Sequence, residues 1–178
     1  MKKTQLRFES IQQVVGGEGM AVILLTDMDR EYAMSVVCDE AMAYQITLRL
    51  NNAQQCSNML PETLVKLLSG RYELMIFGIY DGQYQVVLMD EYGNSKRMRM
   101  TDAVLLSLIS NIPMFIEGTL MAKQCVPFNE NAMGIAIPIN TMDVARLKVA
   151  LEHAVDEENY ELASQLRDEI NKRSNSQE

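Results

Sequence analysis

The chain has 178 residues, a hydrophobic fraction of 48% and a formal net charge of −8. This length suits one ordinary domain with a small appendage, and the acidic balance counts against tight, non-specific binding to duplex nucleic acid. No run approaches the ~18–20 apolar residues that cross a bilayer, and the opening "MKKTQLRFES" lacks the apolar core of a signal peptide, so we expect a cytoplasmic protein with no membrane partner.

Cysteine and histidine usage removes several classes of site. Cys38, Cys56 and Cys125 lie far apart and are odd in number, which predicts reduced thiols in place of a disulfide framework or a zinc site. The single histidine, His153, lies near the C-terminus. A Ser-His-Asp triad or a multi-histidine metal site is therefore excluded from the main part of the chain.

The first fifty residues predict strands followed by a helix. "LRFESIQQVV", "MAVILLTD" and "EYAMSVVC" read as strands, with a turn from Asp27 to Arg30 between the last two. "CDEAMAYQITLRL" then predicts a helix with Asp39 as its cap. The helical spacing rests on Val37, Ala41, Tyr44 and Leu48.

The middle of the chain predicts a second helix and a hairpin. In "LPETLVKLLSG", Pro61 suits the first turn of a helix and Gly70 suits its C-cap, while Leu64, Leu67 and Leu68 share a face. Two strands follow, joined by Asp81-Gly82, a dipeptide that supplies the positive φ angles of a tight turn. After Tyr92-Gly93-Asn94 comes a basic strand, "KRMRM".

Thr101 and Asp102 precede the apolar run "AVLLSLIS", where either side chain can cap a third helix. "PMFIEGTL" predicts a short strand and a turn, and residues 127–140, rich in proline and asparagine, predict a linker. We therefore expect an α+β main domain with a mixed or antiparallel sheet at residues 1–126, then the linker, then a C-terminal helical hairpin at residues 141–175.

The hairpin is predicted from two apolar stripes joined by the polar "DEENY". The stripes are formed by Val144, Leu147, Leu151 and Ala154 in the first helix and by Leu162, Ala163, Leu166 and Ile170 in the second. Two helices of roughly fifteen residues bury little surface alone. A further partner is therefore expected: the main domain, a second copy of the chain or another protein.

The segment "LKVALEHAVDEENYELASQLRDEINKR" resembles the UVR motif of excinuclease B and C subunits and of some chaperone-system proteins. The acidic turn, Tyr160, Ala163 and the run from Leu166 to Ile170 carry the resemblance. It implies a hairpin for protein–protein association, with a protein partner or the chain itself, so a homo-oligomer is expected. The candidate partner-binding residues are Leu147, Leu151, Tyr160, Leu166, Arg167 and Ile170.

Residues 5–125 resemble the bifunctional nuclease domain of bacteria and plants. The resemblance is carried by Glu40-Ala41 with Ile46, "NMLPETLVKLL", "YDGQYQVVLMDEYG" and "RMTDAVLLSLISNIPMFIEGTLM", which follow the family's order. It implies hydrolysis of RNA or DNA, and a C-terminal UVR motif is an arrangement found in that family. The resemblance also implies that Arg99, Asp102 and Glu40 are candidate catalytic residues.

Those residues define a testable site. Arg99 can neutralise charge at a phosphoryl transition state, while Asp102 and Glu40 can hold a divalent metal, Mg²⁺ or Mn²⁺, or act as a base. Alternatively, Asp102 caps a helix or pairs with Arg99, and Glu40 is a first-turn carboxylate. The family's arginine, histidine and aspartate are absent from Asn58 to Leu64, so the competing function is a non-catalytic adaptor that retains the nuclease fold.

Two further charged clusters have plainer interpretations. Asp27, Asp29 and Glu31 alternate like metal ligands on a strand, but they fall at a predicted turn without the glycine of a calcium loop, which favours a solvated turn. The "KRMRM" strand either contacts phosphate or is a charged edge strand that resists pairing.

Overall fold

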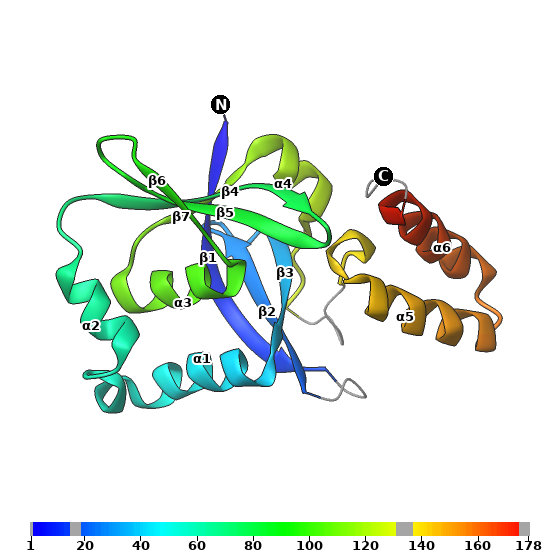
Figure 1. The fold of residues 1–178 in the computed structure, drawn as a ribbon, viewed down its shortest axis with the longest axis horizontal. Helices are drawn as coiled ribbons and strands as arrows, with labels where there is room; N and C mark the ends of the chain where they lie inside the picture. The colour runs from blue at the N-terminus through cyan, green and yellow to red at the C-terminus, as the bar shows by residue number, and fades with distance from the viewer. Residues whose placement is uncertain (1, 15–18, 131–136, 175–178) are drawn as a thin grey trace. The chain divides into compact units, whose positions relative to one another are not determined.

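The computed structural model describes residues 2–14, 19–130 and 137–174. The chain divides into two compact units. The first comprises Met1–Gly78 and Tyr84–Ala136, and the second comprises Ile79–Gln83 and Ile137–Glu178. The first unit contains the sheet, apart from the tip of the β4–β5 hairpin, with its helices, and the second contains a helical pair (Figure 1). The predicted α+β fold class with a C-terminal hairpin is therefore confirmed.

An eight-stranded mixed sheet forms the frame of the first unit, in the order β6-β5-β4-β7-β1-β2-β3-β8. β1 pairs antiparallel with β2 and with β7, whereas β4 and β7 are parallel. The strands are β1 (Lys3–Gln13), β2 (Met20–Asp27), β3 (Tyr32–Asp39), β4 (Tyr72–Tyr80), β5 (Gln83–Asp90), β6 (Ser95–Met98), β7 (Met114–Glu117) and β8 (Val126–Pro127). The three strands predicted before residue 40 and the basic edge strand β6 are therefore confirmed.

Helices α1 (Glu40–Asn52), α2 (Leu60–Leu67) and α3 (Met100–Ser110) lie on one side of the strands in Figure 1, with the 3-10 turn η1 (Ala53–Cys56) between the first two. α1 and α3 contact each other, and α2 contacts α3. Asp39 caps α1 as predicted, since its side chain accepts from the Met42 N–H at 2.7 Å. Asp81 and Gly82 both have positive φ, as a tight hairpin turn requires.

Four details of the helix predictions are wrong. α1 buries Ala43, Ile46 and Arg49 instead of the predicted stripe, and Tyr44 is 62% exposed. α2 ends at Leu67, three residues before Gly70, because Leu68 is already extended.

The other two errors concern the region after the basic strand. α3 begins at Met100, so Thr101 and Asp102 lie inside its first turn, and its cap residue Arg99 makes no side-chain capping bond. The turn expected after Glu117 is instead a helix, α4 (Gly118–Gln124), which contacts β7 and β1. The buried side chains of Leu120 and Gln124 hold this helix, although its sequence carries no capping signal.

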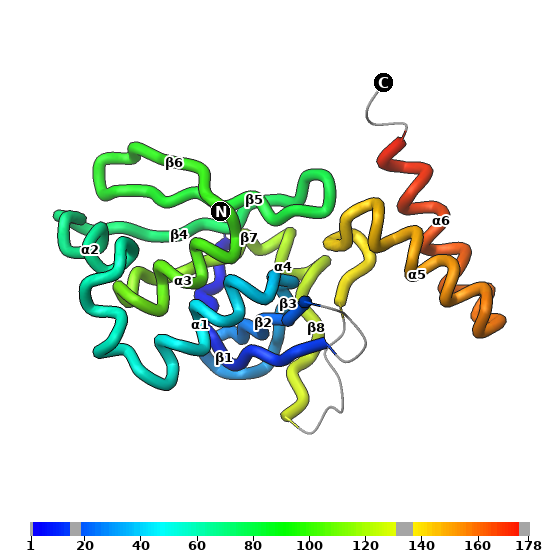
Figure 2. The backbone as a smooth tube through the Cα atoms, turned by 60° about the horizontal axis from the view of Figure 1, so that its bottom comes forward, coloured from blue at the N-terminus to red at the C-terminus, as the bar shows by residue number. Residues whose placement is uncertain are grey.

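The second unit contains a short 3-10 turn η2 (Ile139–Thr141), α5 (Val144–Asp156) and α6 (Tyr160–Ser174). α5 and α6 run side by side in opposite directions around a tight turn (Figure 2), as the short polar connection predicted. Asp143 caps α5 by accepting from the Arg146 N–H at 2.8 Å, and Glu158 takes a positive φ in the turn. Within the described residues, no helix has both the length and the apolar character needed to cross a bilayer.

Candidate interaction hairpin and candidate catalytic residues

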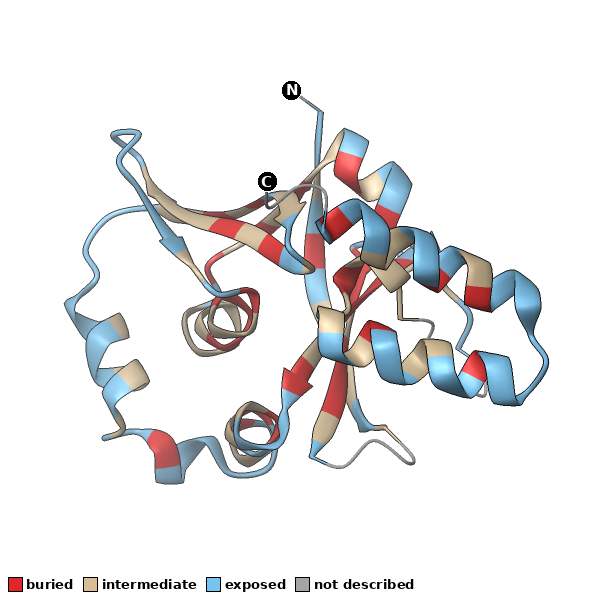
Figure 3. Cartoon of the chain, turned by 45° about the vertical axis from the view of Figure 1, so that its right-hand side comes forward, coloured by how far each residue is buried: buried red, intermediate tan, exposed pale blue. Residues whose placement is uncertain are grey.

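The α5–α6 hairpin closes on a small core of its own. Leu147, Ala154, Ala163 and Leu166 are at most 8% exposed, and Ile139, Met142, Ala150, Leu151 and Ile170 pack against them. Figure 3 shows the buried positions on the facing sides of the two helices and exposed positions on their outer sides. The predicted stripes thus meet each other, which stabilises the hairpin and removes Leu147 and Leu166 from its outer surface.

Arg173 joins the end of α6 to the segment before α5. Its side chain is 8% exposed, and its Nε lies 2.9 Å from Glu169 Oε1. Its two remaining nitrogens donate to backbone carbonyls, one to Met142 and one to Asn140 at 3.1 Å. A guanidinium can satisfy three acceptors in this way because its donors form a planar fork. Arg173 was not among the predicted site residues, because two of its three partners are backbone carbonyls that no sequence pattern reveals.

The remaining partner-binding candidates differ in their accessibility. Tyr160 is 68% exposed at the first position of α6, and Arg167 is exposed one residue after buried Leu166. Leu151 and Ile170 are partly buried against the hairpin core. Only Tyr160 and Arg167 of the six predicted residues therefore project freely enough to meet another molecule without opening the hairpin.

The outer surface of the hairpin carries mixed charge with scattered apolar groups. Residues 144–174 contain seven Asp and Glu against five Lys and Arg. Val149 and Val155 are 67% and 48% exposed. A net negative surface of this kind does not attract a phosphate backbone, because that attraction depends on neutralising phosphates with Lys and Arg.

The candidate catalytic residues Arg99 and Asp102 form a two-point ion pair at the start of α3. Arg99 Nε lies 2.7 Å from Asp102 Oδ2, and its NH2 group lies 3.0 Å from Oδ1. These hydrogen bonds with Asp102 raise the pKa of Arg99, and the carboxylate of Asp39 raises it further. The structure therefore pairs Asp102 with Arg99, which is one of the alternative interpretations of Asp102. The Arg99 side chain remains 73% exposed.

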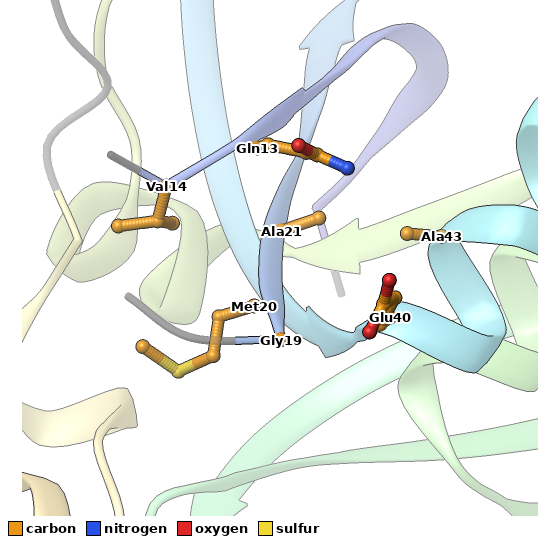
Figure 4. Close-up of a pocket in the computed structure, with 7 residues that line it drawn as sticks. All are labelled: Gln13, Val14, Gly19, Met20, Ala21, Glu40 and Ala43. Carbon is orange, nitrogen blue, oxygen red and sulfur yellow. The ribbon is translucent and has the colours of Figure 1, made fainter. Parts of the chain in front are cut away.

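Glu40 lies elsewhere, at the start of α1. It lines a hollow of about 100 Å³ together with Gln13, Gly19 and Ala43 (Figure 4). Asp102 instead lines a larger apolar groove beside α2. The two carboxylates thus face different hollows, and both oxygens of Asp102 are already occupied by Arg99. In the parts of the chain that the structure describes, no three His, Cys, Asp or Glu side chains gather as metal ligands.

The acidic cluster at the end of β2 lies in a turn, as interpreted from the sequence, but one of its side chains is buried. Asp27 is 7% exposed, and its Oδ1 accepts from the N–H groups of Glu31 and Tyr32 at 2.8 and 2.9 Å. Arg30 takes a positive φ within this turn. The Asp27 carboxylate therefore holds the turn together by satisfying backbone donors.

All three cysteines are free, as predicted. Cys38 and Cys56 are buried, while Cys125 is partly buried. Burial raises the pKa of both Cys38 and Cys125 to about 11, with the carboxylates of Asp39 and Asp27 adding smaller contributions. A thiol with such a pKa stays protonated near neutral pH and is a poor nucleophile.

The geometry thus defines one structurally complete module, an antiparallel helical hairpin with its own core and an exposed outer face. Residues 144–175 match the family model of the UvrB/uvrC motif, named UVR, which confirms the motif and its place on α5 and α6. A search of curated proteins found no match to this chain. The resemblance of residues 5–125 to the bifunctional nuclease domain receives no support from these comparisons.

Proposed function

We propose that this protein is an adaptor whose α5–α6 hairpin binds another protein. The single observation that carries the proposal is the UVR match on a hairpin that closes its own core and leaves Tyr160 68% exposed. Exposed tyrosines anchor many protein interfaces because one side chain buries a large apolar area and still offers a hydroxyl. Arg167 and Asp168, about two turns further along α6, supply charges that select among partners.

A crosslinking experiment tests the adaptor proposal. A photoreactive phenylalanine analogue placed at Arg167 of the full chain captures the neighbour, which is identified by mass spectrometry, purified and titrated against the chain by calorimetry. We expect Tyr160→Ala to weaken that binding about tenfold or more, as loss of an interface anchor does. Tyr92→Ala is the matched control, because Tyr92 is a still more exposed tyrosine (83%) outside the hairpin. Equal binding by both variants contradicts the proposal.

A second candidate is a nuclease that hydrolyses RNA or DNA through Arg99, Asp102 and Glu40, with Mg²⁺ or Mn²⁺ as a possible cofactor. The observation that favours it is the exposed guanidinium of Arg99. The carboxylate of Asp39, at the cap of α1 and one residue before Glu40, contributes to the raised pKa of Arg99. Arginine in such a position can neutralise charge on a phosphoryl group.

The nuclease candidate is tested on single-stranded and duplex substrates with either metal. Activity of the native chain is expected to fall at least about a hundredfold in Arg99→Ala, because one charge-stabilising donor contributes roughly that much. Asp102→Asn retains the shape of the pair and loses its charge, so it is expected to fall as well. Absence of activity, or activity that both variants retain, leaves the adaptor as the function.

A further inference from the structure

An apolar groove opens between α2, α3, the edge strand β6 and its neighbour β5, in the first unit. It has a volume of about 480 Å³, and its lining is overwhelmingly apolar. α2 lines it with Leu60, Leu64 and Leu67, and Leu88, Met98 and Leu105 line it from β5, β6 and α3. Asp102 is the one charged residue among those lining the groove.

The α2 wall is an amphipathic helix with an uncovered apolar face. None of Leu60–Leu67, every one of which is described, is buried. Leu60, Leu64 and Leu67 are 70%, 52% and 74% exposed, at spacings of four and three residues. That spacing gives a single stripe along a helix, the pattern that packs its ridges against another helix.

A polar bridge on the opposite side holds α2 in place. Glu62 and Arg49 of α1 form a two-point ion pair, with Nε to Oε1 at 2.6 Å and NH2 to Oε2 at 3.0 Å. Both side chains are almost inaccessible, at 12% and 6% exposure. α2 is thus fixed through its polar face, and its leucines are left free to line the groove.

One basic residue of β6 lies on the groove side of the sheet. Lys96 is paired directly opposite Leu88 in the antiparallel β5–β6 ladder, so the two side chains lie on the same face of the sheet. Leu88 lines the groove, which places Lys96 on the groove side of the edge strand. Arg99 follows the other end of β6, where its charge is paired with Asp102 and so adds no net charge to the groove.

We infer that this groove binds an amphipathic helix of another protein. That helix carries apolar residues at positions i, i+3 or i+4, and i+7. It carries carboxylates at the end that meets Lys96. The groove is lined by eleven residues. A stable interface between folded partners takes about 20–30 residues a side, so this surface is too small to hold a second copy by itself. A single helix needs only such a row of anchors, and carboxylates on that helix suit Lys96.

Selection from a display library of helix-forming peptides of about 15 residues tests the inference on the full chain, with counter-selection on Leu64→Glu. Enriched peptides, once synthesised, are expected to carry the stated apolar spacing and acidic residues toward one end. In fluorescence anisotropy, Leu64→Glu is expected to weaken their binding about tenfold or more, and Lys96→Glu several-fold. Leu50→Glu is the matched control, because Leu50 is a leucine of equal exposure (50%) on α1 that does not line the groove.

Circular dichroism of each variant establishes that it is folded, and Leu67→Glu replaces Leu64→Glu if the latter unfolds, since Leu67 is 74% exposed. Three results overturn the inference. The first is a selection that yields no peptide distinguishing the native chain from Leu64→Glu. The second is enrichment of sequences without helical spacing or with basic ends. The third is a dimer in sedimentation that Leu64→Glu dissociates and Leu50→Glu does not, because a second copy then occupies the groove.

Discussion

Arg49 is a charged residue that the structure buries within the first unit. Besides its two contacts with Glu62, its NH1 group donates to the Gln45 carbonyl at 2.9 Å and to Gln45 Oε1 at 2.8 Å. Burying a guanidinium costs a large desolvation free energy, so it is tolerated only when its donors are satisfied. The pair therefore positions α2 and makes each partner dependent on the other.

Glu62→Gln removes the charge that compensates Arg49 and changes the shape of the side chain little. We expect the free energy of unfolding to fall by about 3 kcal/mol, as when one partner of a buried pair is lost. Urea denaturation measures this change. Glu73→Gln is the control, because Glu73 pairs with Lys3 at a half-exposed position (31% and 39%) where such pairs contribute about 0–1 kcal/mol. Equal losses in the two variants contradict the account.

Cys38 makes the free energy of unfolding decrease with rising pH in the alkaline range. Burial, aided by Asp39, raises its pKa from 9.0 to about 11, so the unfolded chain ionises this thiol before the folded chain does. The contribution of Cys38 is therefore fully present below pH 9 and is lost as the pH rises towards 11, by up to about 2–3 kcal/mol. Urea midpoints at pH 8 and pH 10.5 should fall less in Cys38→Ala than in the native chain. The same fall in both chains would show that other groups cause it.

At the scale of elements, the hairpin depends on contacts at its open end as well as on its apolar stripes. Arg173 on the last turn of α6 holds the carbonyls of Asn140 and Met142, which precede α5. The last four carbonyls and first four amides of any helix lack partners inside it, so helix ends fray unless something ties them down. Arg173 ties the end of α6 to the segment just before α5.

Arg173→Gln is expected to lower the local stability of α6 by about 2–3 kcal/mol, because it removes the ion pair with Glu169 and at least one carbonyl contact from a buried position. Amide hydrogen exchange resolves this as lost protection in the last two turns of α6. Lys172→Gln is the neighbouring control, since the Lys172 side chain is 76% exposed and its nitrogen lies 3.9 Å from Glu169. Unchanged protection in Arg173→Gln would refute the anchoring role.

At the scale of the whole molecule, the two units bury very different cores. Four buried side chains form the centre of the hairpin, whereas β2 and β3 alone bury Ile23, Leu25, Met34 and Val36 among others. Since stability follows buried apolar area, the hairpin belongs at the low end of the range of local stabilities.

Amide exchange of the full chain should therefore show α5 and α6 opening at lower free energy than β2 and β3. Leu166→Ala is expected to cost the hairpin about 2–5 kcal/mol, as large-to-small core substitutions do, and to leave protection in β2 unchanged. A parallel loss of protection in β2 would mean that the two units unfold as one cooperative body.

Local sequence patterns determined many of the helices, strands and turns of the fold. The apolar alternation before residue 40, the Asp81-Gly82 turn, the Asp39 cap and the two stripes of the hairpin all rely on interactions within a few residues, so the sequence alone predicts them. The UVR resemblance is likewise local, and the family model confirms it for residues 144–175. α4 escaped prediction because it depends on burial of Leu120 and Gln124, which come from the tertiary fold.

Only the tertiary structure decided which side chains are available for function. Periodicity indicates that Leu147, Leu166 and Leu64 each belong to an apolar stripe, but it does not show what covers that stripe. The first two are 0% and 1% exposed because the hairpin helices cover each other, whereas Leu64 is 52% exposed because α2 is held through its polar face. Likewise, Asp102 reads as a cap or a ligand in the sequence, and the fold places it against Arg99. Burial and pairing depend on residues distant in the chain, so they follow only once the chain has folded.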